Sequence, residues 1–131
     1  MKKLDLFLAI SLPIFFISAI ITLYFFIGFE NYNIFYPHID TRFANDFSIE
    51  NFDKVEMGMN KAQVKNLLGN PINSGESIGY TDDFIKKEFI FYEKYSTDGK
   101  YEISDFAWES FEVYYDIDTL VISKRSIWYY D

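Results

Sequence analysis

A long run without a single charged residue, Leu6–Phe29 (LFLAISLPIFFISAIITLYFFIGF), constrains the fold more than any other feature of the sequence. As a helix it would be about 36 Å long at ~1.5 Å per residue, enough to cross a hydrocarbon core of about 30 Å. Lys2 and Lys3 precede the run and Glu30 follows it. The excess of positive charge before the run predicts a cytoplasmic N-terminus.

A cleaved signal peptide is the alternative interpretation of this run. Signal peptides have an apolar stretch of about 7–15 residues that ends in small residues at the cleavage site. Here the stretch is longer, and Phe25, Phe26 and Phe29 occupy the place where cleavage would occur. We therefore expect an uncleaved signal-anchor: a cytoplasmic tip and single transmembrane helix over residues 1–29, in contact with the lipid bilayer through residues 6–29.

Composition restricts what the rest of the chain does. The chain has 131 residues, a formal net charge of −8, no Cys and one His. An acidic chain lacks the clustered cations that phosphate contacts need, which argues against nucleic-acid binding. The absence of Cys excludes disulfides and thiolate zinc sites, and a single His excludes most His-based metal sites.

The pattern after the run predicts an α+β domain. Residues 30–47 show no periodicity and are expected to form a linker, and Ser48 is a good N-cap for a short helix up to Val55. A second helix follows Asn60, and the Gly/Ser/Asp-rich stretch from Asn73 to Asp83 reads as a loop. Three strands come next, Glu88–Tyr95, Trp108–Tyr115 and Leu120–Tyr129. The expected fold is a transmembrane helix, then two short helices packed on a three-stranded antiparallel meander (ααβββ).

The second helix carries the clearest local signals in the chain. Asn60 is an N-cap with Gln63 three residues later, the spacing of a capping box, and Met59 and Val64 have the spacing of a hydrophobic staple. Helix termination is predicted by a glycine followed by a proline. The predicted structural motif comprises Gly58, Met59, Asn60, Gln63, Val64, Leu67, Leu68, Gly69 and Pro71.

The stretch from Val55 to Pro71, with its Gly-Met pair, capping residue and Leu-Gly-x-Pro ending, resembles the BamE-like (SmpA/OmlA) domain family. The resemblance extends over roughly residues 48–125. It implies a BamE-like α+β domain over residues 48–131 that binds other proteins in the bacterial cell envelope, possessing no catalytic activity. The best-known members are lipoproteins that assist outer-membrane protein assembly.

The sequence departs from the family in having no lipid-accepting Cys, which excludes a lipid anchor. The resemblance and the anchor together imply a protein of the bacterial inner (cytoplasmic) membrane whose C-terminal domain is extracytoplasmic, in the periplasm if there is an outer membrane. The expected function is protein binding or scaffolding with an envelope protein partner, as an accessory in outer-membrane or envelope protein assembly. The alternative is an inhibitor or sensor module that binds a soluble extracytoplasmic protein through its sheet.

No residue pattern predicts a catalytic, cofactor or metal site. Asp82-Asp83 and Asp116/Asp118 are the tight carboxylate groups, and Asp side chains in turns ordinarily bond nearby backbone N–H groups. Strand alternation is expected to place most of the strand glutamates outward, and His38 lies in the linker with no partner motif. We therefore expect no enzyme activity and no cofactor.

Aromatic residues are unusually dense, with 15 Phe and 11 Tyr in the chain. One interpretation is a thick aromatic core with an ordinary exposed remainder. The other is an exposed patch for a partner, since aromatic side chains are enriched at interfaces. The candidate partner surface comprises Phe91, Trp108 and Trp128.

Overall fold

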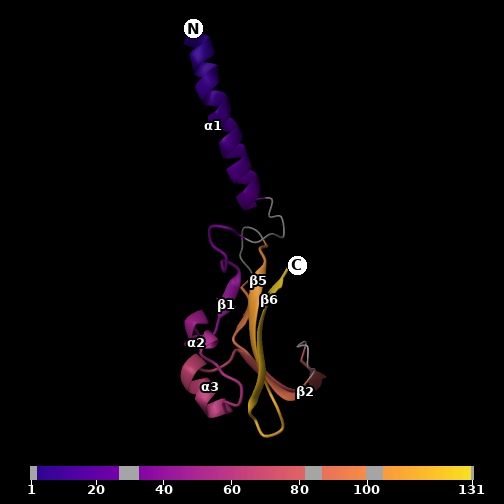
Figure 1. Ribbon diagram of the computed structural model, residues 1–131. Helices are drawn as coiled ribbons and strands as arrows, with labels where there is room; N and C mark the ends of the chain where they lie inside the picture. Colours follow the sequence, from indigo (N-terminus) through magenta and orange to yellow (C-terminus); the bar gives the residue numbers. More distant parts are fainter. Residues whose placement is uncertain (1–2, 27–32, 82–86, 100–104, 131) are drawn as a thin grey trace.

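The computed structural model describes residues 3–26, 33–81, 87–99 and 105–130 (Figure 1). Within these ranges the chain forms three helices and six strands. In chain order they are α1 (Lys3–Phe26), β1 (Thr41–Phe43), α2 (Ile49–Asp53), α3 (Lys61–Leu68), β2 (Asn73–Tyr80), β3 (Glu88–Lys94), β4 (Ser96–Asp98), β5 (Trp108–Tyr115) and β6 (Val121–Tyr129).

The strands form two sheets, so the expected three-stranded meander is wrong. One sheet has four antiparallel strands in the order β2-β3-β5-β6, and the other pairs β1 with β4. The stretch expected to be a loop after residue 72 is β2, because its backbone pairs with β3 despite a composition that disfavours strands. The stretch expected to be a linker contains β1, and Asp40 and Ala44 in it are buried.

The expected membrane anchor is contradicted. Among the described residues, no helix is long and apolar enough to cross a membrane. The uncharged run of the sequence is Leu6–Phe29, whereas α1 begins with Lys3, carries Asp5 in its first turn and ends at Phe26. The expected inner-membrane location and the expected extracytoplasmic placement of the domain both depend on that anchor. Both expectations are therefore wrong as stated.

Helices α2 and α3 cover one face of the four-stranded sheet (Figure 1). The core beneath them is continuous. It comprises Ala44, Phe52, Val55, Val64, Leu68, Tyr95, Phe111, Val113, Tyr115 and Val121. Of the predicted apolar stripe on α3, Val64 and Leu68 are fully buried, whereas Leu67 is partly buried at the edge of the core.

The segment around α3 is held by its own side chains and backbone. The Asn60 side chain accepts a hydrogen bond from the Gln63 N–H at 3.0 Å, and the Asn60 N–H donates to Gln63 Oε1 at 2.9 Å, which completes a capping box. Gly69 ends the helix with φ 77°. The Met59 carbonyl accepts from Val121 N–H, so the segment is tied to the start of β6. These contacts give the segment a structural role.

Candidate functional site

The two faces of the sheet have different chemistry. In antiparallel strands, residues directly opposite each other point to the same face. Phe111, Val113 and Tyr115 of β5 point toward the helices and belong to the core. The alternate residues Glu112 and Tyr114 therefore point to the opposite face, which we call the far face.

A buried carboxylate organises the far face. Glu112 is 1% exposed, and the register places Lys94 of β3 and Arg125 of β6 directly opposite it on the two neighbouring strands. Lys94 Nζ lies 2.8 Å from Glu112 Oε1, and Arg125 Nε donates to Oε2 at 3.0 Å. Ser110 donates to Oε1 and Tyr114 to Oε2, so four donors converge on the two carboxylate oxygens.

These donors keep Glu112 ionised. Burial by itself raises the pKa of the Glu112 carboxyl, but the hydrogen bonds from Lys94, Tyr114 and Arg125 outweigh it and lower the pKa to about 2. Burial and the bond to this carboxylate raise the pKa of Tyr114 well above its ordinary value. Glu112 is therefore a fixed acceptor that holds two cations in place, and it is poorly suited to exchange protons near neutral pH.

Two hollows lie beside this network and share Phe89, Tyr114 and Arg125. One has a volume of about 320 Å³ and extends to Thr81 and Ser123. The other has a volume of about 220 Å³ and is also lined by residues that include Lys94 and Tyr129. We call the two together the far-face groove. The ring centroids of Phe89 and Tyr114 are 4.6 Å apart, so its centre is aromatic.

The wall formed by β2 depends on two glycines. Every residue of β2 is exposed except Gly75 and Gly79. A Cβ on Gly75 would lie 2.9 Å from the Tyr92 ring, and one on Gly79 would lie 2.6 Å from the Phe89 ring. Aromatic rings of β3 therefore lie against the bare backbone of β2, where the sequence pattern predicts a loop.

The candidate partner surface is not one surface in the structure. Trp108 stacks on Tyr129 across β5 and β6, with ring centroids 4.8 Å apart. Trp128 stacks on His38 at 5.4 Å instead, and Phe91 packs against the core under the ammonium of Lys61. Because β6 residues alternate in direction, Trp108 shares the face of Tyr129, and Trp128 points to the other face.

Glu112 is the site residue that sequence reasoning missed. Alternation correctly predicts that it points away from the helices, but the predicted exposure is wrong, because Glu112 is 1% exposed. The signal that identifies it is the pairing register, which places a Lys and an Arg opposite the same Glu. Register is set by tertiary pairing and is weakly encoded in any one strand.

Asp116 and the histidine have structural partners. Asp116 Oδ1 accepts the N–H groups of Asp118 and Leu120, which is turn chemistry as expected. His38 Nε2 lies 2.9 Å from Glu109 Oε2, so the histidine has a partner in the structure. The segment with Asp82 and Asp83 lies outside the described residues.

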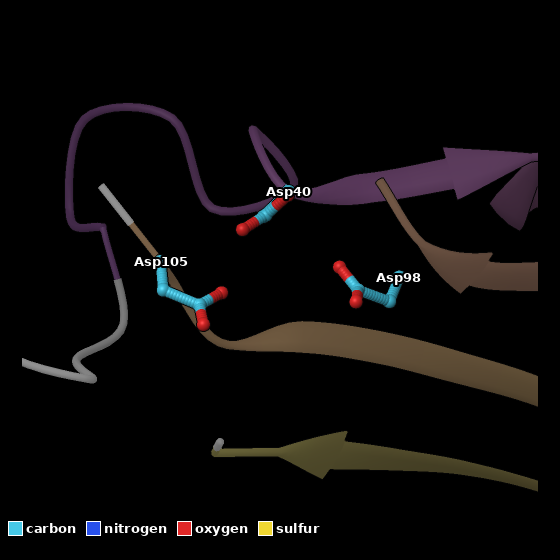
Figure 2. A group of neighbouring side chains, drawn as sticks. All are labelled: Asp40, Asp98 and Asp105. Carbon is cyan, nitrogen blue, oxygen red and sulfur yellow. The ribbon is translucent and has the colours of Figure 1, made fainter. Parts of the chain in front are cut away.

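Three carboxylates that no sequence motif connects come together at Asp40, Asp98 and Asp105. One oxygen from each lies within 4.8 Å of the others (Figure 2). Asp40 is buried and its Oδ2 accepts from the Phe106 N–H at 3.1 Å. All three residues also take part in further interactions. Carboxylate clusters of this kind occur without a metal, so the cluster does not define a metal centre.

Comparison with known proteins gives no relative: no family model, curated protein or solved structure matches the chain. The far-face groove is therefore the basis for assigning a function.

Proposed function

We propose that this chain is a non-catalytic protein-binding module of the BamE-like type, and that it contacts its protein partner through the far-face groove. The observation that carries the proposal is the groove itself, in which aromatic rings lie beside two cations fixed by a buried carboxylate. Aromatic and Arg side chains are the residue types that dominate binding energy at protein interfaces.

The chemistry of the groove favours binding over catalysis. Its carboxylate has both oxygens occupied, and a general base needs an oxygen that reaches the substrate. The resemblance of the Gly58–Pro71 segment to BamE-like domains supports the same class of function, because members of that family bind proteins. In this chain that segment is tied to β6 and serves the scaffold.

The position of the groove favours one kind of binding module over a passive scaffold. That kind is an inhibitor or sensor, which acts on its partner through the sheet. The groove lies on the sheet, away from α2 and α3. If the partner is an enzyme, titrating the chain into its assay separates the two: a fall in activity supports the inhibitor, and unchanged activity supports the scaffold.

Site-specific photo-crosslinking tests the proposal. p-Benzoylphenylalanine replaces Tyr92 or Tyr129 in the groove, and Lys65 on the exposed side of α3 is the matched control position. We expect a protein adduct of defined mass from the two groove positions only. The partner identified in this way, once purified, should bind the wild-type chain in calorimetry. Equal adducts from Lys65, or none from the groove, would contradict the proposed surface.

A further inference from the structure

The far-face groove has the size of a side-chain site. Its larger hollow, about 320 Å³, is at the lower end of the range of about 300–1,000 Å³ that small-molecule pockets occupy. A hollow of this volume has room for one or two amino-acid side chains of a partner segment.

The charge of the groove is opposite to that of the chain. The chain as a whole carries −8, yet two cations meet at one carboxylate here. Their side chains are 35% and 33% exposed, so both reach solvent over the groove. The salt bridge to Glu112 uses one of the three N–H donors of the Lys94 ammonium.

The two cations are also held in position before any ligand arrives. Lys94 and Arg125 are fixed by Glu112, and the Arg125 guanidinium lies 5.0 Å from the centroid of the Tyr114 ring. Fixing a long side chain in advance removes part of the entropy cost that binding would otherwise carry. Charge-assisted bonds from such donors to a carboxylate are roughly twice as strong as neutral ones.

We propose that the groove binds a partner segment in which an acidic side chain lies next to an aromatic one, with the carboxylate at Lys94 and Arg125 and the ring against Phe89 and Tyr114. This inference rests on the proposed function and specifies the chemistry of the partner. The other end of the groove is lined by two buried hydroxyl residues, Thr81 and Ser123, and Thr81 Oγ1 accepts the Lys87 N–H at 3.1 Å.

Two peptides that differ only in charge test the proposal on the wild-type chain. The probes are acetyl-Phe-Asp-amide and acetyl-Phe-Asn-amide. Binding of each peptide is measured by NMR titration, from the shifts of the backbone amides of the chain. We expect the Asp peptide to bind at least about tenfold more tightly, with shifts centred on Lys94 and Ser123, and the difference to shrink at high salt. Equal affinities would overturn the proposal.

Variants of the chain then test which residues cause the preference for the Asp peptide. Lys94→Gln should abolish the preference for the Asp peptide, whereas Lys54→Gln, the same charge change at the C-cap of α2, should leave it intact. Gly79→Ala keeps both cations but displaces the Phe89 ring, so it should weaken both peptides several-fold. A Lys94→Gln variant that is shown to be folded by its NMR spectrum and retains the preference would contradict the site.

The remaining outcomes separate this inference from the proposed function. Binding of 3-phenylpropionate without binding of either peptide would make the groove a site for a small free acid and overturn the polypeptide ligand. Crosslinks from Tyr129 with equal peptide affinities would reject the acidic ligand and leave the protein-binding function standing. A preference for the Asp peptide with no protein adduct would reject the proposed function and leave the acidic ligand standing.

Discussion

Lys94 and Glu112 lie directly opposite each other on β3 and β5, with Lys94 Nζ 2.8 Å from Glu112 Oε1. The lysine is 35% exposed and the glutamate side chain is 2% exposed. The pair thus extends from the floor of the far-face groove to solvent. The buried carboxylate controls the position of a cation that a ligand can reach.

Replacing Glu112 should destabilise the chain through its partners. Glu112→Gln keeps the shape but leaves Lys94 and Arg125 without their buried anion, and we expect a loss of about 1–3 kcal/mol in the free energy of unfolding. Glu76→Gln on exposed β2 is the control and should stay within about 0.5 kcal/mol. Urea denaturation of the two variants measures the difference, and equal losses would mean that the network contributes little.

The same network predicts a pH dependence of stability. The pKa of Glu112 is lowered from 4.5 to about 2 in the folded chain, so the unfolded chain binds the proton more readily. This contribution is complete above about pH 4.5 and is lost as the pH falls toward 2. The difference in unfolding free energy between wild type and Glu112→Gln should therefore be constant from pH 7 to 5 and shrink below that. A difference that persists at pH 2 would contradict the assignment.

The buried side of α3 gives a graded test of the core. Leu68 is 0% exposed, and Leu68→Ala should cost about 2–5 kcal/mol of unfolding free energy. Leu67→Ala should cost less because Leu67 lies at the edge of the core, and Lys65→Ala should stay within about 0.5 kcal/mol. Thermal or chemical unfolding in that order checks the helix orientation, and an equal loss at Leu67 and Leu68 would show that it is misplaced.

Two glycines with positive φ separate backbone strain from crowding. Gly58 has φ 86° with open space around its missing Cβ, whereas Gly69 has φ 77° and its Cβ would lie 2.6 Å from Asp46 Cβ. Gly58→Ala should cost about 1–2 kcal/mol from strain. Gly69→Ala should cost more, because Asp46 has to move as well. Comparable losses in equilibrium unfolding would show that the contact with Asp46 relaxes freely.

Local patterns were sufficient to predict α3. Its cap, its buried positions Val64 and Leu68 and its terminating glycine depend on residues within one helix, and the structure has all of them. The short helix after Ser48 is present for the same reason.

The elements that were missed depend on partners distant in sequence. Strand β1 has three residues and exists through its pairing with β4, more than fifty positions later. Strand β2 is Gly- and Ser-rich, and its pairing with β3 outweighs its weak intrinsic preference. Glu112 was missed because alternation gives the direction of a side chain, and only the register reveals what covers it.

The bare backbone of β2 has a consequence for how binding can be observed. This strand is held to the sheet by ladder bonds and by rings that belong to β3, and it contributes almost no buried side chain of its own. Its amide protons should consequently exchange with solvent sooner than those of β5, most of whose residues are buried. A segment resting on Phe89 and Tyr92 would press these rings onto the glycines, so ligand binding should register as slowed hydrogen exchange along β2.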